Sequence, residues 1–280
     1  MSNVRLSNLG QISGPVNRRT QNILLDDGVT ENAKRALLKQ IFGSGSGAAN
    51  SLVFREEITE ITTDMYASIA DGTFDLVHVG MRYTAPSGRT YFLADADYFF
   101  GHGDAEMNFH HMLVIEDDCN HTAQHQTTNV TTGGAASSLL YTTTLPAYQS
   151  ELEADFGAAH IKEARILMCN ATANGMPSGW AWAGKKAFIM NMPMVFGHYL
   201  QFPGNTGEMF NGGNRVRQLS LFQKMPETVI SRLHSTQARQ WYWCDDVASA
   251  AAFALVYVYG VAGSGSASDV GGVRRAFLIG

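Results

Sequence analysis

The sequence predicts an α+β fold in which a few helices pack on an irregular, mostly antiparallel sheet. The chain has 280 residues, of which 45% are hydrophobic and 16% are charged, so it carries enough apolar side chains for a sizeable core. It contains 28 glycines but only 7 prolines. Together with many Thr, Ser and Asn residues, this composition favours short strands joined by turns over a helical bundle.

The first 50 residues are predicted to form an arm that precedes the main domain. A helical pattern covers residues 30–41, with its apolar side chains on roughly one face. It stops at residues 43–47 (Gly-Ser-Gly-Ser-Gly), a run whose composition is typical of a flexible linker. We therefore place a boundary near residue 50. Residues 1–50 are expected to serve in attachment or oligomerisation, and residues 51–280 to form one domain.

Two further helices are predicted within this domain. The first covers residues 60–70 and ends at an Asp-Gly pair. The second covers residues 146–159, where tyrosine, leucine and phenylalanine recur every four residues and would share one face. Residues 188–196 are apolar and rich in methionine, and their pattern does not decide between strand and helix.

Short runs of β-branched, aromatic and aliphatic residues predict the strands. These runs cover residues 52–54, 76–79, 90–94, 112–115, 166–168, 218–222 and 240–243. Residues 120–138 are rich in Thr, Asn, Gly and Gln, and we expect them to form a long ordered loop. The end of the chain alternates small and apolar residues with turn formers, so most of the sheet should be antiparallel.

Composition and charge argue against several classes of protein. Lys and Arg number 20 against 25 acidic residues, and no basic block occurs, so we expect no nucleic-acid partner. No stretch is long enough to insert into a membrane, and no secretory signal is visible. The three cysteines, Cys119, Cys169 and Cys244, are too far apart and odd in number for a disulfide framework. A soluble protein made in a cytoplasm fits these features.

The histidines do not show the spacing of a metal site. His110 and His111 are adjacent, so on a strand they would point to opposite faces. His121 and His125 are four residues apart, but in a stretch without a helical apolar face. No His-Glu-x-x-His or Cys-x-x-Cys motif occurs. We therefore predict no metal and no cofactor, with the histidines in polar loops and one in the core.

Paired carboxylates are the main catalytic candidates, because they can perform acid–base chemistry or hold calcium. The pairs are Asp95 with Asp97, Asp117 with Asp118, and Asp245 with Asp246. At strand ends and turns such residues more often accept hydrogen bonds from backbone N–H groups, and we favour that interpretation. No nucleophile elbow occurs outside residues 43–47, and Cys244 has no neighbouring cation or histidine in sequence. We predict that the protein is not an enzyme; the enzymatic alternative is a glycan hydrolase with two converging carboxylates.

The tryptophans fall in two short segments, Trp180-Ala181-Trp182 and Trp241-Tyr242-Trp243. On a strand, Trp241 and Trp243 would share one face. We expect core positions, because a tryptophan buries a large area. An aromatic platform for a sugar is the alternative.

The last forty residues follow a recognisable order. An aromatic segment, Trp-Tyr-Trp-Cys-Asp-Asp-Val at residues 241–247, is followed by residues 257–270 and then by Gly-Val-Arg-Arg-Ala-Phe at residues 272–277. This order resembles the C-terminal module of variable proteins from diversity-generating retroelements. Members of that family have a C-type-lectin fold and end in an aromatic strand, a variable stretch and a closing Gly-Val-Arg-Pro-like strand. The resemblance implies a C-type-lectin-like domain with a variable region at about residues 244–271.

Short pieces in the middle of the chain extend the resemblance to about residues 60–280. They are Ile-Ala-Asp-Gly-Thr-Phe-Asp at 69–75, Val-Gly at 79–80, His-His at 110–111, Thr-Thr-Gly-Gly at 131–134, Phe-Gly at 156–157, Gly-Trp-Ala-Trp at 179–182 and Leu-Phe at 221–222. In this order they resemble a group of phage virion proteins. The resemblance therefore implies a virion protein assembled in the cytoplasm of a bacterial host.

The resemblance also selects candidate binding residues. In this family, adenines of a template are replaced at random when the variable region is copied, so an Asn codon AAC yields Tyr, Val, Gly, Ser, Asp or Ala. The residues that fit this rule are Ala252, Tyr257, Val258, Tyr259, Val261, Gly263, Ser264, Gly265, Ser266, Asp269 and Val270, with Asp245 at the rim. An ordinary loop rich in Gly and Ser would also pass this test, although Tyr257-Val258-Tyr259 is unlike such a loop. Binding residues concentrate on loops that a rigid scaffold holds.

The resemblance implies a phage receptor-binding protein that displays a diversified surface to a protein or glycan receptor on the host cell. The arm would contact other virion proteins. Because members of the family are often trimers, the resemblance also implies a homotrimer, which would raise weak affinity through avidity. The chain departs from the family at Arg275, where Pro is usual, and at Cys244-Asp245, where Leu-Arg is usual. The alternative is a structural virion protein without diversification, such as a head decoration or tail connector, whose tail packs in an interface.

Overall fold

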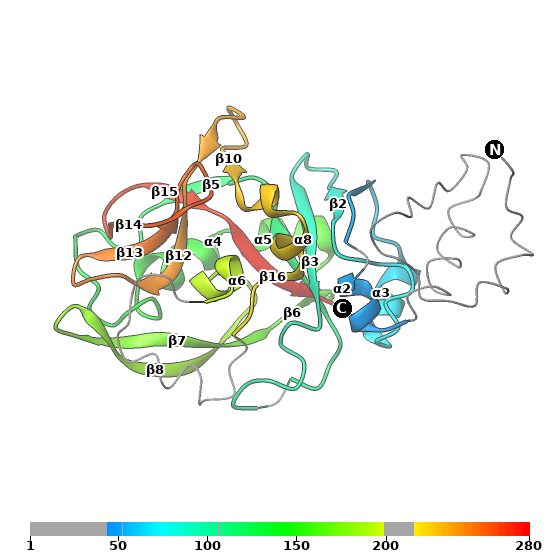
Figure 1. The fold of residues 1–280 in the computed structure, drawn as a ribbon, viewed down its shortest axis with the longest axis horizontal. Helices are drawn as coiled ribbons and strands as arrows, with labels where there is room; N and C mark the ends of the chain where they lie inside the picture. The colour runs from blue at the N-terminus through cyan, green and yellow to red at the C-terminus, as the bar shows by residue number, and fades with distance from the viewer. Residues whose placement is uncertain (1–43, 52, 106, 199–215) are drawn as a thin grey trace, which may run out of the picture.

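The polypeptide forms two main sheets that share its C-terminal segment (Figure 1). The computed structural model describes residues 44–51, 53–105, 107–198 and 216–280. This part of the chain is α+β, mostly sheet with a few short helices, as the sequence predicts. The helix predicted at residues 30–41 lies outside the described residues.

The larger sheet has seven strands in the order β1-β2-β3-β4-β16-β6, with β9 also paired to β16. Its neighbours are antiparallel except β1 and β2. The strands are β1 (Glu56–Ile58), β2 (Met81–Thr84), β3 (Thr90–Ala96), β4 (Met112–Glu116), β6 (Ile161–Lys162), β9 (Phe188–Ile189) and β16 (Arg275–Ile279). Strands β3, β4 and β16 are buried along their whole length, so both faces of the sheet centre are covered.

The smaller sheet has five strands in the order β14-β13-β12-β15-β5. They are β5 (His121–Ala123), β12 (Tyr242–Val247), β13 (Ala252–Val256), β14 (Ala262–Ser266) and β15 (Gly271–Val273). Only Arg274 separates β15 from β16, so one extended segment crosses from the smaller sheet into the larger one. Figure 1 shows this segment in red between the two sheets.

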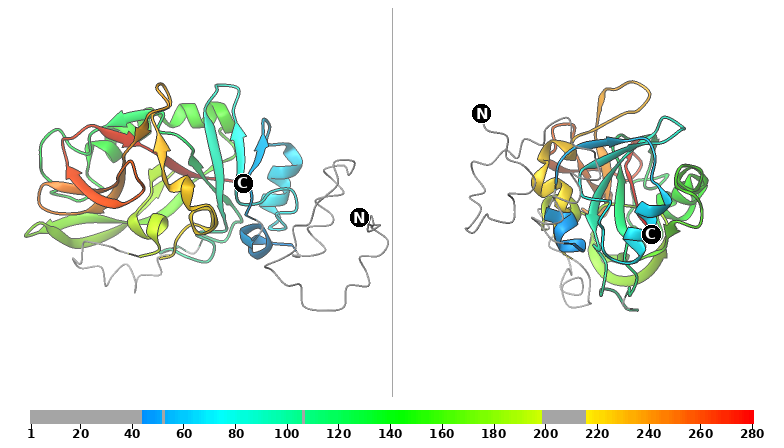
Figure 2. Two further views of the ribbon diagram at one scale, coloured as in Figure 1. Left: turned by 45° about the horizontal axis from the view of Figure 1, so that its top comes forward. Right: turned by 90° about the vertical axis from the view of Figure 1, so that its right-hand side faces the viewer.

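Two ribbons complete the β-structure. The long hairpin of β7 (Ala164–Ala173) and β8 (Met176–Lys185) extends along one side of the molecule (Figures 1 and 2). The short hairpin of β10 (Ser231–Arg232) and β11 (Arg239–Gln240) projects near the smaller sheet. Both ribbons are antiparallel.

The helices are short. They are α2 (Ser46–Ser51), α3 (Thr63–Ala70), the π-helix η2 (Leu140–Thr144), α4 (Leu145–Ala147), α5 (Gln149–Phe156), α6 (Met192–Phe196), α8 (Ser220–Lys224) and the 3-10 helix η3 (Pro226–Val229). Helix α3 begins where the Thr62 side chain accepts a hydrogen bond from the Met65 amide, which is an N-cap. Among the helices of the described residues, none is both long enough and apolar enough to span a bilayer.

Two apolar cores lie on opposite faces of the larger sheet. On β3, Phe92 and Ala94 enter the core that continues into the smaller sheet, whereas Tyr91 and Leu93 enter the core beside α3 and α5. This alternation follows from the two-residue period of a strand. Trp243 is fully buried, and its indole N–H donates to the Ala123 carbonyl at 2.9 Å, so the predicted core position is confirmed for this residue.

Several predicted elements are confirmed and three are wrong. The strands predicted at residues 90–94, 112–115, 166–168 and 240–243 and the helices at 60–70 and 146–159 occur, the last as α4 and α5 with η2 before them. Residues 76–79 lie in turns and irregular structure instead of a strand. Residues 218–222 lie largely in helix α8, because a short buried apolar run has no period that separates strand from helix. Residue 52 of the strand predicted at 52–54 lies outside the described residues, residues 53–54 are not in a strand, and the first strand is β1.

The predicted flexible linker is also wrong over residues 46–47, which belong to helix α2. Ala48 and Ala49 are buried, and the Asn50 side chain bonds both the amide and the carbonyl of Ala96 at 2.8 Å. Small residues serve here because α2 packs closely on β3. Helix α2 spans residue 50, where the domain boundary was expected.

Candidate binding surface

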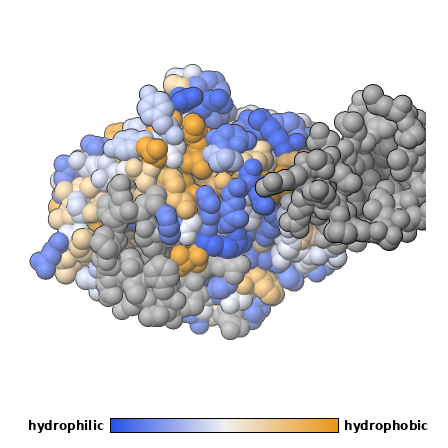
Figure 3. All heavy atoms as spheres, in the orientation of Figure 1, coloured by the Kyte–Doolittle hydropathy of each residue, from blue (hydrophilic) through white to orange (hydrophobic). Residues whose placement is uncertain are grey.

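Four exposed large apolar residues lie on the β13–β14 hairpin and the turn that follows it. The exposed fraction is 43% for Tyr257, 72% for Tyr259, 56% for Val261 and 58% for Val270. Among the described residues, these are four of the nine large hydrophobic side chains that are exposed. Figure 3 shows hydrophobic residues over the half of the molecule that holds β12–β15. Such a concentration marks an interaction surface more often than a scattered exposed residue does.

A tight turn holds the two tyrosines at the tip of the hairpin. The Gly260 amide donates to the Tyr257 carbonyl at 2.8 Å, and the Tyr257 amide donates to the Val261 carbonyl at 2.8 Å. Gly260 has a φ of +79°, in the left-handed region that favours glycine. Val258 and Tyr259 are therefore the central residues of the turn. Val258 is half-buried, whereas Tyr259 projects into solvent.

Arg239 of β11 extends this tip. Its guanidinium carbon lies 5.9 Å from the centre of the Tyr259 ring, a cation–π arrangement. The turn also packs on the end of η3 and the residue after it, because a Cβ at Gly260 would lie 3.6 Å from the Val229 side chain and 3.4 Å from that of Ile230. Tyrosine and arginine are the residue types that most often dominate binding surfaces. Sequence reasoning missed Arg239, because it precedes the aromatic strand and nothing local connects it with residues 257–261.

Strand β14 has an outer and an inner face. Ser264 is exposed, and Ser266 pairs with Ala252 of β13 on the same outer face, where both are half-buried. Side chains on this outer face can change without entering the core. These three residues and the tip therefore form the part of the predicted surface that is open to substitution.

The inner face carries the two glycines of the predicted set. A Cβ at Gly265 would lie 3.1 Å from the Trp243 ring and 3.0 Å from Leu255, closer than ordinary contact. A Cβ at Gly263 would collide with the Tyr257 ring. The glycines thus make room for the rings of Tyr257 and Trp243 that cover them, and a side chain at either position would have to displace a ring.

The turn after β14 is docked on the neighbouring loop. The Ser266 amide donates to the Asp269 carboxylate at 3.0 Å, and the Asp269 amide donates to the Ser266 carbonyl at 2.8 Å. The Ser268 hydroxyl donates to the Asn129 side chain at 2.6 Å, and the Gln124 amide group donates to the Ser268 carbonyl. Asp269 is exposed although its carboxylate closes the turn. The long loop of residues 124–131 therefore supports the surface, a role that its composition alone does not reveal.

Asp245 lies apart from the hairpin surface. It lines a small cavity with Ile189, Asn191 and Met194, and the Tyr141 hydroxyl donates to its carboxylate at 3.4 Å. Burial, reinforced by the neighbouring carboxylate of Asp246, raises the pKa of Asp245 well above its usual range. These contacts place Asp245 beside β9 and α6 instead of beside the exposed tyrosines.

Most of the other carboxylates singled out in the sequence have structural partners. Asp95 forms a bidentate pair with Arg217, and Asp117 pairs with Arg82 at 2.6 Å. Asp246 accepts a hydrogen bond from the Met192 amide at 2.6 Å at the start of α6. The preference for structural roles over catalysis is consistent with these contacts.

The histidines and cysteines are also possible metal ligands or nucleophiles by residue type. No group of three or more metal-ligand side chains occurs within the described residues. His125 is buried and stacks on Phe253 at 3.9 Å, and burial lowers its pKa to about 3. The three cysteines are buried and unpaired. His125 is therefore a core histidine, but His111 is equally buried and His78 nearly so, and the prediction of a single core histidine is wrong.

Comparisons with known proteins found no match to the chain among family models, curated proteins or solved structures. The function must therefore be argued from the hairpin tip, its outer face and the loop that supports them.

Proposed function

We propose that the protein is a phage virion receptor-binding protein that presents the tip and outer face of the β13–β14 hairpin to a receptor on the host cell. The observation that carries this proposal is the concentration of exposed Tyr257, Tyr259, Val261 and Val270 on one hairpin and its following turn. Tyrosine supplies a large contact area at a low entropic cost, and Ser and Gly adapt around it.

A C-type-lectin-like fold is part of the proposal. Its support is the order of the C-terminal elements: the aromatic strand β12, the exposed β13–β14 hairpin, and then the closing segment of β15 and β16. Strand β12 pairs with β13 on one side and with β15 of the closing segment on the other, so the hairpin is anchored along β13 and leaves β14 at the sheet edge. Such a frame tolerates exchange of exposed side chains without loss of the core.

The first test is deep sequencing of the 3′ end of the gene in a virus population. We expect substitutions to cluster at codons for Ala252, Tyr257, Val258, Tyr259, Val261, Ser264, Ser266, Asp269 and Val270, at adenines of a nearby template. The inner-face codons Gly263 and Gly265 should vary less, because their side chains would enter occupied space. A tail that varies no more than the rest of the gene would exclude diversification and favour a structural virion protein.

Binding itself is tested with a Tyr257→Ser/Tyr259→Ser variant in an adsorption assay with host cells. We expect at least about a tenfold loss of adsorption, because truncation of aromatic anchors costs 2 kcal/mol or more at a hot spot. The matched control is Met176→Ser, an exposed hydrophobic side chain (39%) at the tip of the β7–β8 ribbon. Equal adsorption by both variants would contradict a receptor site on the hairpin.

The oligomeric state completes the proposal. We propose a homotrimer, in which the segment before residue 44 joins the copies and contacts other virion proteins. Light scattering on the full chain should give three times the monomer mass, and deletion of residues 1–43 should give the monomer. A full-length monomer would contradict this arrangement and the avidity that it provides.

A further inference from the structure

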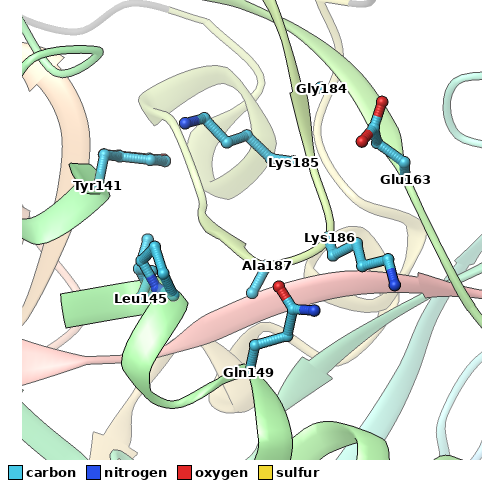
Figure 4. Close-up of a pocket in the computed structure, with 9 residues that line it drawn as sticks. Tyr141, Leu145, Gln149, Glu163, Gly184, Lys185, Lys186 and Ala187 are labelled. Atoms are coloured by element: carbon cyan, nitrogen blue, oxygen red, sulfur yellow. The ribbon is translucent and has the colours of Figure 1, made fainter. Parts of the chain in front are cut away.

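A cleft lies away from the hairpin surface, between the end of β8 and the helical segment from η2 to α5 (Figure 4). Its volume is about 260 Å³. Pockets for drug-sized ligands usually measure about 300–1,000 Å³, so this cleft suits a smaller molecule of about one ring. The residues that line it are Tyr141, Leu145, Pro146, Gln149, Glu163, Gly184, Lys185, Lys186 and Ala187.

The walls of this cleft are fixed by hydrogen bonds. The Tyr141 hydroxyl accepts from the Ile189 amide at 3.2 Å, which locks the ring against β9. On the helical side, Gln149 donates to Glu153 at 2.6 Å, and Glu153 pairs with Lys186 at 3.7 Å. This chain joins α5 to the end of the β7–β8 ribbon. The cleft is therefore preformed, as small-molecule sites usually are.

Lys185 is the cation of this cleft that lacks a counter-ion. Its ammonium lies 5.5 Å from the centre of the Tyr141 ring, and Figure 4 shows the side chain extending toward that ring. Among the described residues, no carboxylate lies within ion-pair distance of this ammonium, whereas the adjacent Lys186 has Glu153. The Lys185 side chain is half-buried, so part of its hydration is lost, and the Tyr141 ring offsets this loss only in part. An anionic group of a ligand would supply the missing partner.

Glu163 limits the charge that such a ligand can carry. It is exposed at the cleft, and its carboxylate lies over Gly184, where any Cβ would collide with it. Like charges that approach one another disfavour binding, so a ligand with a second negative group near Glu163 would be repelled. Leu145, Pro146 and Ala187 leave room for an uncharged body between the two charged side chains.

We propose that this cleft binds a ring-sized monocarboxylate, with the carboxylate at Lys185 and the ring against Leu145 and Pro146. The ligand can be a sugar acid, whose hydroxyls would meet Gln149 and Lys186, or a cyclic hydrocarbon acid. The proposal does not depend on the receptor-binding role of the hairpin.

Ligand-observed NMR with the full chain tests this proposal on two matched pairs of probes: glucuronate against glucose, and cyclohexanecarboxylate against cyclohexanecarboxamide. We expect at least one carboxylate to bind with a Kd of about 1 mM or lower, and its neutral partner to bind at least tenfold more weakly. Which pair responds distinguishes the polar ligand from the apolar one. Absence of binding by both carboxylates up to about 10 mM would overturn the proposal.

Two variants give opposite expected signs. Lys185→Met should weaken carboxylate binding at least tenfold, because it removes the charge, whereas Glu163→Gln should strengthen it, because it removes the repulsion. The controls are Lys224→Met and Glu227→Gln, exposed residues of α8 and η3 outside the cleft, which should leave the Kd unchanged. Unchanged binding in Lys185→Met, or weaker binding in Glu163→Gln, would overturn the proposed placement of the ligand.

Discussion

At the scale of single residues, the most constrained charges are Arg275 and Glu116, which are fully buried on neighbouring strands of the larger sheet. The guanidinium bonds Glu116 at 2.5 Å and also contacts Glu151 at 3.1 Å and the Tyr148 carbonyl at 2.8 Å. The Arg275 amide donates to the same Glu116 carboxylate at 2.8 Å. A proline at position 275, usual in the family that the sequence resembles, would lack this amide. In this chain the Glu116 carboxylate therefore binds both the amide and the guanidinium of Arg275, which stands where the family usually has proline.

Replacement of Arg275 by alanine should strongly destabilise the protein. The change leaves Glu116 buried without a counter-ion, and breaking a buried pair in this way costs about 3–5 kcal/mol. Urea unfolding measures the loss. The matched control is Arg55→Ala, because Arg55 and Glu57 form an exposed pair worth about 1 kcal/mol or less. Equal losses in the two variants would show that burial does not set the strength of the Arg275 pair.

Asp246 should make the protein less stable as the pH rises. Burial raises the pKa of Asp246 to about 7, whereas an Asp in the unfolded chain ionises near pH 4. Between about pH 4 and pH 7 the unfolded chain loses a proton that the folded protein keeps, so the free energy of unfolding falls as the pH rises. Below pH 4 the carboxyl is protonated in both states and has no such effect.

The variant Asp246→Asn isolates this effect. Asparagine keeps an oxygen that accepts from the Met192 amide but does not titrate. From pH 5 to pH 8 the wild type should lose at least about 1.4 kcal/mol more than the variant, the equivalent of one pKa unit. Urea unfolding at both pH values measures the difference between the two proteins. His125 has the opposite effect, because its lowered pKa makes stability rise with pH, but it contributes equally to both proteins and cancels from the difference. Parallel curves would contradict the assignment to Asp246.

At the scale of elements, the two faces of β14 should respond differently to the same substitution. Gly265→Val places two methyl groups against Trp243 and Leu255, and overpacking of this kind costs about 1–3 kcal/mol. Ser264→Val, on the exposed face, should change stability by about 0.5 kcal/mol or less. Thermal unfolding of the two variants tests this. A neutral Gly265→Val would mean that the inner face can also be diversified.

The same elements show how far the sequence predicts the structure. Long, strongly patterned runs were predictable: β3, β4 and α3 lie where their hydrophobic pattern and end signals place them. Leu219, Leu221 and Phe222 are buried in and beside helix α8, yet a strand of the same length would bury them equally well. The local pattern does not decide between helix and strand here, because packing partners distant in sequence supply the energy that selects one of the two.

The candidate surface was predictable only in part, for a related reason. The exposure of Tyr257 and Tyr259 follows from a local turn, and the glycine that permits this turn is visible in the sequence at position 260. The contribution of Arg239 and the docking of Ser268 on Asn129 depend on contacts between segments far apart in the chain. The cleft at Lys185 depends on a helix and a ribbon that meet only in the folded protein.

At the scale of the whole molecule, Arg274 joins the two sheets. It is fully buried between β15 and β16, and its guanidinium donates to the Glu116 carbonyl of the larger sheet at 2.7 Å. It also donates to the Val229 carbonyl at 3.2 Å and to the Tyr242 hydroxyl of the smaller sheet at 3.4 Å. Since one strand segment and one side chain connect both sheets, neither sheet can open without disturbing the other.

The two sheets should therefore unfold as one cooperative unit. Native-state hydrogen exchange compares the amides of β4 with those of β13, and their opening free energies should agree within about 1 kcal/mol. In Arg274→Met the apolar stem remains but the three bonds are lost, so β13 should open at a lower free energy than β4. If β13 already opens first in the wild-type protein, the smaller sheet is an independent unit, and its hairpin would be displayed on a flexible support instead of a rigid one.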